Sequence, residues 1–501
     1  MKYTLGLFIL AFSMVFSVAP HSAQSEIQIR VVGGPLVDEA NAVIPLGNST
    51  YVVGSTSSHA DGTVRGYIVH YDADFQFAWS MLTPYGSPVE QAVDAWDNVP
   101  SGSSGDLTVL SQRLGENDAY NIVLHTIKNL GNSGAIVETI EVMHPLNQDP
   151  VSAVNWQGSR WAVGNVEGDG WLLNIDDPSS VEGASYMTWG HPVISEHVES
   201  ASVYGDTLFV AGSTEIDGVL QSTVWAWGPD GNPLWARISP DTGTFGANVA
   251  NDIAIGPDGL VLMYSYERED LPLGHRVMHL EVENGTPGAP VDASSDDFME
   301  GCNIAWAGNQ LVSLSHVDFE TGSESDMFLT WLGTYGGYIS SGILGTDFED
   351  EPRDLTIDSQ GRIWVLGVTH GFLNGSSSIC VYRLDSIDVI PNISSVTPGL
   401  GIKNDPIFLN SVGLSTPFIQ KNAHTLFPNP CSSNSSVAIS SSTQGVWGEE
   451  RKAWSVYTLD GQLQKEGVSN VIDCAGLADG AYVVLITSAT QVSRLPLQII
   501  H

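Results

Sequence analysis

The chain has 501 residues, of which 42% are hydrophobic and 15% are charged, so it can bury a sizeable core and is not a disordered protein. Its 57 acidic and 18 basic residues give a formal net charge of −39. This charge would repel a phosphate backbone, which argues against nucleic acid as a partner. The content of glycine (52 residues) and tryptophan (14 residues) is typical of a turn-rich, β-leaning protein.

Residues 1–25 are typical of a secretory signal peptide. Lys2 precedes an apolar run from Leu5 to Ala19, and small and polar residues follow this run. The run is short for a membrane-spanning helix, and no second stretch of about eighteen apolar residues occurs. We therefore predict an exported chain whose mature part begins near residue 26 and has no transmembrane segment.

Residues 26–390 contain seven copies of a repeat. Each copy has an apolar strand that ends at one fixed point, in most copies with glycine or another small residue, and these points are 48 to 57 residues apart. This period suits one four-stranded sheet per repeat and indicates a propeller or an array. The seven strands are TYVVG ending at Gly54, LTVLS at Ser111, RWAVG at Gly164, LFVAG at Gly212, LVLMY at Tyr264, LVSLS at Ser315 and IWVLG at Gly367.

Three further strands are predicted around each aligned strand. An inner apolar strand precedes it, as in NDIAI and RDLTI, and an alternating strand follows it, as in GYIVHYD and ICVYRLD. A fourth, outer strand often carries an aromatic residue after a turn, as in DADFQFAW. Seven repeats of four strands predict an all-β fold, a seven-bladed β-propeller.

The two ends of the repeat region are predicted to meet in one blade. The seventh repeat reaches Asp385 with only three convincing strands, while EIQIRVVGG forms an extra strand before the first repeat. We predict that Ile27 to Val32 completes the last blade as its outer strand, paired with the strand that contains Cys380. The competing candidate, IDVIPNI, is interrupted by Pro391.

Residues 391–422 are rich in Pro, Gly, Ser and Asn and predict a linker. Residues 423–501 contain two Asp-Gly turns, at Gly461 and Gly480, and predict a separate small β-sandwich. In an exported chain Cys431 and Cys474 are candidates for a disulfide within this segment. The other two cysteines, Cys302 and Cys380, lie in apolar strands of different repeats, and buried thiols are favoured over a bridge between them.

The C-terminal segment resembles the type A C-terminal sorting domain of the type IX secretion system. The motifs FPNP, VYTLDGQL and LADGAYVVLI and the strand RLPLQII follow one another in the family's order. The resemblance implies a bacterium of the Bacteroidota, passage through the periplasm and the outer membrane, and removal of the domain by a sortase-like protease. The passenger is then secreted or joined to anionic lipopolysaccharide at the cell surface. By match, the characteristic positions are Pro428, Asn429, Pro430, Gly461, Gly480 and Tyr482.

The sequence carries no strong catalytic, metal-binding or cofactor signature. The patterns H-E-x-x-H, G-x-S-x-G, G-x-x-x-x-G-K-[ST] and C-x-x-C are all absent, so no catalytic residue, metal or cofactor is predicted. His275 and His279 are four residues apart but lie in a strand-like context. His279 shares its repeat position with His70, Asn174 and Arg383, and we interpret this position as solvent-facing rather than metal-binding.

Two classes of function stay open. The favoured class is a non-catalytic binding or adhesion protein, whose glycan or protein ligand docks at the ends of the propeller channel. The alternative is an extracellular hydrolase or lyase that acts on polysaccharide or peptide with acids from several blades. A cluster of Asp, Glu, His or Arg at one mouth of the channel would favour the enzyme. Packing between blades is preferred over sugar stacking for four tryptophans, Trp79, Trp225, Trp227 and Trp235.

Overall fold

The computed structural model describes most of the repeat region and parts of the C-terminal segment. The described residues are 27–388, apart from 34–35, 59–62, 85–88, 98–105, 116–118, 132, 143–146, 177–185, 191–193, 240–245, 257–258, 268–272, 294–297, 319–324, 347 and 374–375, followed by 392–393, 403–406, 424–427, 431–432, 436–441, 453–458, 463–469, 471–478, 480–487 and 492–500. The predicted signal peptide lies outside these residues.

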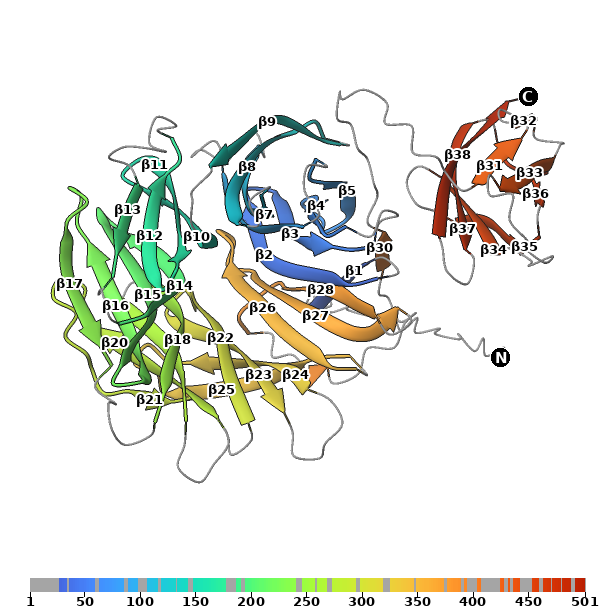
Figure 1. Ribbon diagram of the computed structural model, residues 1–501. Coiled ribbons are helices and arrows are strands. Elements are labelled where there is room, and N and C mark those ends of the chain that lie inside the picture. Colours follow the sequence, from blue (N-terminus) through green and yellow to red (C-terminus); the bar gives the residue numbers. More distant parts are fainter. Residues whose placement is uncertain are drawn as a thin grey trace, which may run out of the picture.

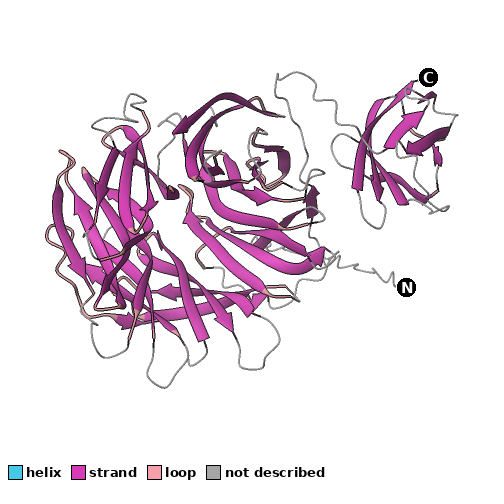
Figure 2. Ribbon diagram, in the orientation of Figure 1, coloured by secondary structure: helices cyan, strands magenta, loops and turns pink. Residues whose placement is uncertain are grey.

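The repeat region forms seven antiparallel sheets arranged as a ring, and strands are the regular elements drawn throughout it (Figures 1 and 2). Among the described residues there is no helix long and apolar enough to span a membrane. The seven-bladed propeller predicted from the repeats is therefore confirmed, and each aligned strand is the second strand of its blade.

The blades follow one another along the chain. Blade 1 contains β2 (Asp38–Leu46), β3 (Ser49–Thr56), β4 (Arg65–Tyr71) and β5 (Phe77–Leu82); blade 2 contains β6 (Glu90–Asp97), β7 (Leu107–Leu114), β8 (Tyr120–Asn129) and β9 (Gly134–Val142); blade 3 contains β10 (Asp149–Trp156), β11 (Ser159–Val166), β12 (Asp169–Asn174) and β13 (Tyr186–Trp189). Blade 4 contains β14 (Glu196–Tyr204), β15 (Thr207–Ile216), β16 (Val219–Trp227) and β17 (Pro233–Ile238); blade 5 contains β18 (Asn248–Gly256), β19 (Gly259–Tyr266), β20 (Gly274–Leu280) and β21 (Val291–Asp292). Blade 6 contains β22 (Phe298–Ala307), β23 (Gln310–Asp318), β24 (Ser325–Leu332) and β25 (Tyr338–Leu344); blade 7 contains β26 (Asp350–Ile357), β27 (Ile363–Leu373) and β28 (Ser376–Leu384) together with β1 (Ile27–Gly33).

Strand β1 closes the ring as predicted. It pairs antiparallel with β28, and Val31 lies opposite Cys380. Val31 and Val32 are fully buried in the two clusters that pack on either face of blade 7. The Arg30 guanidinium donates from Nε and Nη2 to the carbonyl oxygen of Phe75 in blade 1, at 2.9 and 2.6 Å. The N-terminal strand is thus tied to both blades that meet where the ring closes.

Part of the predicted linker also forms strands. β29 (Asn392–Ile393) pairs parallel with β25, and β30 (Lys403–Pro406) pairs parallel with β1. The chain therefore continues to hydrogen-bond to blades 6 and 7 after the last repeat. This pairing covers part of the outer edges of these two blades, which would otherwise present unpaired main-chain groups.

Every inner strand contains a β-bulge directly beside the residue on which the repeats align. The bulge brings the inner strand close to the second strand. A Cβ atom on Gly54 would lie 2.1 Å from the carbonyl oxygen of Glu39, and one on Gly212 would lie 1.8 Å from that of His197. At these two positions a side chain would overlap the main chain of the inner strand, whereas the equivalent positions of blades 2, 5 and 6 carry Ser111, Tyr264 and Ser315.

The core of the propeller lies between adjacent blades. One buried cluster joins blades 7 and 1, another joins blades 2 and 3, and a third joins blades 3 and 4. Trp79, Trp225, Trp227 and Trp235 are at most 9% exposed and belong to such clusters, which confirms the packing interpretation. These rings contribute large buried areas to the contact between blades.

The C-terminal strands, orange to red in Figure 1, form two further sheets. One buried cluster combines Ile472 from the smaller sheet with Trp454, Tyr482 and other residues from the larger one. The smaller sheet has the order β31 (His424–Phe427), β33 (Ser436–Ser441) and β36 (Val471–Asp473); the larger has β32 (Cys431–Ser432), β38 (Val492–Ile500), β37 (Gly480–Thr487), β34 (Ala453–Thr458) and β35 (Leu463–Val468).

Candidate functional site

The inner strands of all seven blades line one cavity of about 780 Å³, which is the central channel of the ring. Because each inner strand has a bulge, the residue after the bulge takes an equivalent place in every blade. We call these seven positions the channel ring. They are Ala42, Asp94, Ser152, Ser200, Asp252, Asn303 and Asp354.

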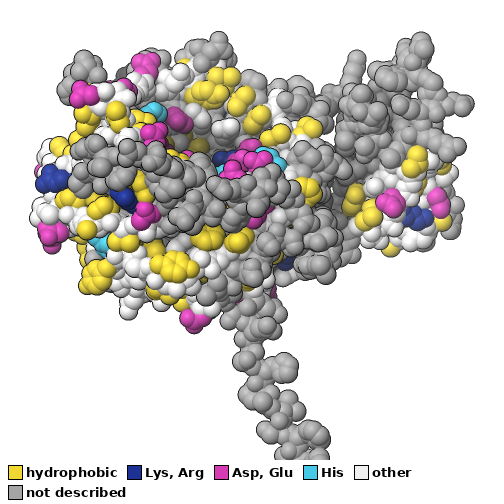
Figure 3. All heavy atoms as spheres, turned by 90° about the horizontal axis from the view of Figure 1, so that it is seen from below, with side chains coloured by type: hydrophobic (Ala, Val, Ile, Leu, Met, Phe, Trp, Pro, Cys, Tyr) yellow, Lys and Arg dark blue, Asp and Glu magenta, His cyan; other side chains and the backbone are white. Residues whose placement is uncertain are grey.

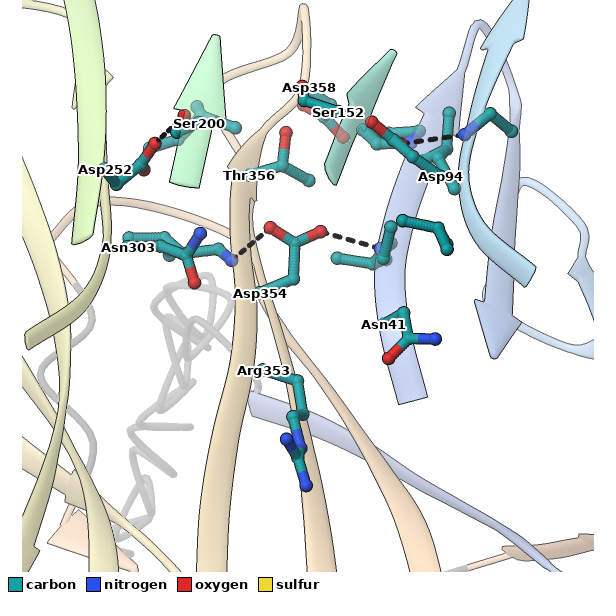
Figure 4. Close-up of a pocket in the computed structure, with 18 of the residues that line it drawn as sticks. Asn41, Asp94, Ser152, Ser200, Asp252, Asn303, Arg353, Asp354, Thr356 and Asp358 are labelled. Atoms are coloured by element: carbon teal, nitrogen blue, oxygen red, sulfur yellow. Dashed lines mark hydrogen bonds between the residues drawn. The ribbon is translucent and has the colours of Figure 1, made fainter. Parts of the chain in front are cut away.

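Asp94, Asp252 and Asp354 of the channel ring each bind two main-chain N–H groups. In blade 2, Oδ1 of Asp94 accepts a hydrogen bond from the nitrogen of Ala95, and Oδ2 accepts one from the nitrogen of Ala153 in blade 3, both at 2.8 Å. Each carboxylate therefore caps its own strand and that of the next blade, as the dashed lines at Asp354 show in Figure 4. The same pattern joins Asp252 to Ile253 at 2.7 Å and Ile304 at 2.8 Å, and Asp354 to Leu355 at 2.8 Å and Val43 at 2.7 Å.

The three aspartates belong to blades 2, 5 and 7. With this spacing, no main-chain N–H group is capped by two of them. Three carboxylates with two N–H groups each cap six of the seven equivalent N–H groups around the channel. The seventh group belongs to Ala201 in blade 4. Ser152, the channel-ring residue of blade 3, has a side chain too short to reach as an aspartate does. Among the described residues, blade 4 is thus the blade whose main-chain N–H group is capped by no channel-ring aspartate, although Asp252 accepts a hydrogen bond from the hydroxyl of Ser200.

The three capping carboxyls have raised pKa values. Burial raises the pKa of Asp94 and of Asp252 to about 6 and that of Asp354 to about 7, although the main-chain hydrogen bonds act in the opposite direction. The charges of Asp94 and Asp252 add to the rise at Asp354. Burial therefore disfavours the ionised form of all three carboxyls, and at Asp354 the charges of the other two act in the same direction.

Glu199 is the bulged residue of blade 4 and also lines the channel. The side chain is open to the channel solvent, yet the surrounding protein raises its pKa to about 7, with a smaller contribution from the charge of Asp149. Within the part of the chain that the structure describes, its carboxylate, unlike those of the three aspartates, caps no inner strand. Glu199 is therefore an acid of the channel wall that is available to a ligand.

Charged groups also gather at one mouth of the channel, where the inner strands begin. Nη2 of Arg353 donates to Glu39 of blade 1 at 2.9 Å and to Glu351 at 2.6 Å. Nε2 of His370 lies 3.2 Å from Oε1 of Glu351. These side chains are about one-third exposed, and acidic, basic and histidine side chains surround a hollow in the space-filling view (Figure 3).

A second charged cluster lies inside blade 2. Nε2 of His125 is 2.7 Å from Glu90, Nδ1 is 3.0 Å from the hydroxyl of Thr139, and Nε of Arg113 donates to Glu90 at 2.6 Å. Burial would raise the pKa of Glu90, but the hydrogen bonds and charges of His125 and Arg113 lower it. His125 is fully buried, so this network joins the four strands of the blade and offers its imidazole to no substrate.

The two histidines considered as a metal pair do not converge. His275 and His279 lie four residues apart on β20, which places them about 13 Å apart along an extended strand. Among the described residues, no group of three or more His, Cys, Asp and Glu side chains could hold a metal ion. The solvent-facing interpretation of the recurring polar position is wrong, because His70 is 4% and Arg383 is 7% exposed.

The cysteine and sorting-motif predictions are only partly covered by the described residues. Cys380 is buried and Cys302 half-buried, and both are unbridged, as predicted. Cys474 is buried, but the side chain of Cys431 lies outside the described residues, so their disulfide stays a prediction. Tyr482 is buried and its hydroxyl donates to the carbonyl oxygen of Ala478 at 2.9 Å. Gly480 begins β37, whereas four positions of the motif, Pro428, Asn429, Pro430 and Gly461, lie outside the described residues.

The channel-ring aspartates were not singled out from the sequence. A signal was present, since each aspartate stands two residues after an alanine or proline near the start of an inner strand, in AVD, AND and PRD. The strands NDIAI and RDLTI contain two of the three. Their partners are main-chain N–H groups about 50 to 310 residues away, and no pattern of side chains marks such a partner.

Comparisons with known proteins reveal no family for this chain. No family model matches it, and no curated protein matches it. Among solved structures, the β-propeller domain of the Trilobed protease from Pyrococcus furiosus is similar with a TM-score of 0.42 and 11% identity, over 70% of this chain and 98% of that one. The acylaminoacyl peptidase of Pyrococcus horikoshii is similar with a TM-score of 0.40 and 11% identity, over 70% of this chain and 52% of that one.

Proposed function

We propose that the chain is an exported, non-catalytic binding protein whose propeller presents its channel and channel mouths to an extracellular glycan or protein. The observation that carries this proposal is the use of the three channel-ring aspartates. Both oxygens of Asp94, Asp252 and Asp354 accept main-chain N–H groups. A general acid or base must instead direct an oxygen towards the substrate.

The charged cluster at the channel mouth favours a second candidate, an extracellular hydrolase or lyase. It brings Glu39, Glu351, Arg353 and His370 together, as catalysis by acids from different blades would require. However, the single Nη2 of Arg353 is shared by both carboxylates, so the acids are held by a cation rather than set opposite each other. This arrangement supports binding better than acid–base chemistry.

The proposed route of export is the type IX secretion system, with residues 423–501 as a sorting domain that folds as a β-sandwich. The proposal is supported by the order of the sequence motifs and by the shared core of the two C-terminal sheets. The proposed partners are the secretion machinery, its sortase-like protease and, for a surface-attached form, anionic lipopolysaccharide. The proposed location is the cell surface or the medium.

Two experiments test these proposals. Residues 26–501 are applied to a glycan array and, separately, to a panel of polysaccharide, glycoside and peptide substrates; we expect binding on the array and no turnover. Turnover that is lost in Glu351→Gln would replace the binding function by the enzyme. For export, residues 423–501 fused to an unrelated signal-bearing passenger should carry it outside a Bacteroidota cell, and a passenger retained in the periplasm would contradict the sorting role.

A further inference from the structure

The channel wall at blades 3 and 4 differs from the rest of the channel ring. Elsewhere an aspartate caps the N–H group that follows each channel-ring residue, but at blade 4 this group belongs to Ala201, and the channel-ring residue of the preceding blade is Ser152. Glu199 lies directly before the channel-ring residue Ser200 of the same blade. The Ser200 hydroxyl is engaged, since it donates to Asp252, so the wall offers the uncapped N–H of Ala201, the hydroxyl of Ser152 and the carboxylate of Glu199.

We propose that this place is a binding subsite for an uncharged polyhydroxylated ligand, such as the edge of a neutral sugar. A hydroxyl group can accept a hydrogen bond from the Ala201 N–H or the Ser152 hydroxyl and donate one to Glu199. An ammonium group cannot accept a hydrogen bond, so it cannot bind the Ala201 N–H as an aspartate would. This inference rests on the proposed binding function and assigns its ligand class.

The charges of the channel exclude an anionic ligand from the same place. The residues that line the cavity include six acids, Asp94, Asp97, Glu199, Asp252, Asp354 and Asp358, and one cation, Arg353. Arg353 is in addition bound to Glu39 and Glu351. A sugar acid would therefore meet repulsion that a neutral sugar does not.

The size and the lining of the cavity set the expected affinity. A volume of about 780 Å³ is within the range of small-molecule pockets and accommodates a small saccharide. No aromatic residue is among the described residues that line it, so a sugar ring would bind through its hydroxyl edge without stacking. We expect a dissociation constant on the order of 1 mM, which is typical of weak recognition by a few hydrogen bonds.

The decisive variant is Ser152→Asp, which places a carboxylate where the other blades have their cap. By the geometry of Asp94, whose Oδ2 reaches the next blade at 2.8 Å, the new side chain should bind the N–H of Ala201. The matched control is Asn303→Asp, which adds the same charge to the channel ring. There the neighbouring N–H groups of Ile304 and Leu355 are already capped by Asp252 and Asp354.

Binding is measured by ligand-observed NMR titration of residues 26–501 with glucose, galactose, mannose, N-acetylglucosamine, glucuronate and methylammonium. We expect at least one neutral sugar to bind, with at least about tenfold loss in Ser152→Asp and in Glu199→Ala, and with less than about twofold change in Asn303→Asp. Glucuronate should bind at least about tenfold more weakly than the neutral sugar, and methylammonium should not displace it. Thermal melts of each variant verify that it is folded.

Three results would overturn the inference: no neutral sugar binds up to about 20 mM, Asn303→Asp and Ser152→Asp weaken binding equally, or methylammonium competes with the sugar. The first two leave the proposed binding function intact if the glycan array is positive and unaffected by Ser152→Asp, because the ligand would then contact another part of the propeller. A negative array together with turnover of a substrate would instead remove the binding function itself.

Discussion

Two interfaces of the propeller hold neighbouring blades together by different means. Between blades 7 and 1, where the chain enters blade 1 from β1, Asp354 caps Val43 at 2.7 Å and Arg353 bridges to Glu39 at 2.9 Å. Between blades 3 and 4, Asn165 donates to the carbonyl oxygen of Val198 at 3.0 Å and accepts from its nitrogen at 2.7 Å. The closure uses charged groups, whereas the second interface uses an amide.

The difference is consistent with the missing main-chain cap at blade 4 of the channel ring. An amide that exchanges two hydrogen bonds with the next strand joins blades 3 and 4 away from the channel axis, and a cluster containing Trp156, Trp225 and Trp227 packs beside it. A channel-ring carboxylate is therefore not needed at that interface. At the closure, by contrast, β1 and β28 are paired only by hydrogen bonds and are not joined by a turn. The cap by Asp354 adds to this pairing.

The largest effect is expected from removing the closure itself. Deletion of residues 26–33 takes away β1, its ladder to β28 and the buried side chains of Val31 and Val32. Unpaired β28 and β30 would then face solvent, so we expect loss of the cooperative thermal transition in calorimetry. Tyr335→Ala, which truncates a side chain that is 81% exposed, is the control and should melt like the parent. A deletion variant that still melts cooperatively within a few degrees of the parent would refute closure by β1.

A smaller loss is expected from Asp354→Ala, which leaves two main-chain N–H groups of blades 7 and 1 without their cap. Hydrogen bonds to charged groups contribute about 1.5–3 kcal/mol each to stability. In the variant, water in the channel would hydrogen-bond to the two N–H groups and recover part of this free energy. We expect the free energy of unfolding to fall by about 3 kcal/mol in urea titration. Ser152→Ala, at an equivalent ring position that caps nothing, should change it by less than about 0.5 kcal/mol. Equal effects of the two variants would show that the cap does not stabilise the closure.

Asn165→Ala tests the other interface. It removes both hydrogen bonds to Val198 and leaves a buried donor and acceptor without them, so we expect a loss of about 2 kcal/mol in the same urea titration. Because Asn165 and Asp354 have no shared partner, their effects should add in the double variant. Strong coupling between them would indicate that the two interfaces open together.

The pH dependence of stability should also separate the interfaces. The pKa of Asp354 rises from 3.8 to about 7 on folding, so the folded state binds more protons between these values. The contribution of this group to stability is thus fully present below about pH 4 and is lost as the pH rises through about 7. Asp354→Asn should flatten this decline, as seen in melting temperatures between pH 5 and 8, while Asn165→Ala should leave the slope unchanged. An unchanged slope in Asp354→Asn would contradict the raised pKa.

His70 acts with the opposite sign at the contact of blades 1 and 2. Burial lowers its pKa from 6.5 to about 4, and its ring stacks on Tyr51 at 4.7 Å. Its contribution is lost as the pH falls through this range, because the unfolded state binds the proton first. The pH dependence of stability contains the contributions of both Asp354 and His70. The comparison of Asp354→Asn with the parent isolates the contribution of Asp354.

The smallest effect is expected outside both interfaces, at His279 on β20. His279→Ala should change the free energy of unfolding by less than about 1 kcal/mol, because the histidine is only half-buried and its neighbour His275 is too far along the strand to share a ligand. The metal content of the purified protein, measured by mass spectrometry, should be unchanged. Stoichiometric zinc that is lost in His279→Ala would show a metal site that the strand geometry argues against.

The repeat period, the strand pattern and the closing role of Ile27 to Val32 could be predicted from the sequence, because a blade is built from local alternation and turns that recur along the chain. The sequence also shows that most of the aligned strands end in glycine or another small residue. The close approach of the inner strand, which leaves no room for a side chain at Gly54 or Gly212, appears only when the two strands are paired.

The candidate site was decided by the tertiary structure. Asp94, Asp252 and Asp354 are three of many acids in the sequence, and their role depends on N–H groups that the ring brings beside them from the next blade. The same holds for the position of blade 4 that no aspartate caps. It is defined by the order of the blades around a closed circle, and a linear pattern contains no signal for a contact that exists only after the circle has formed.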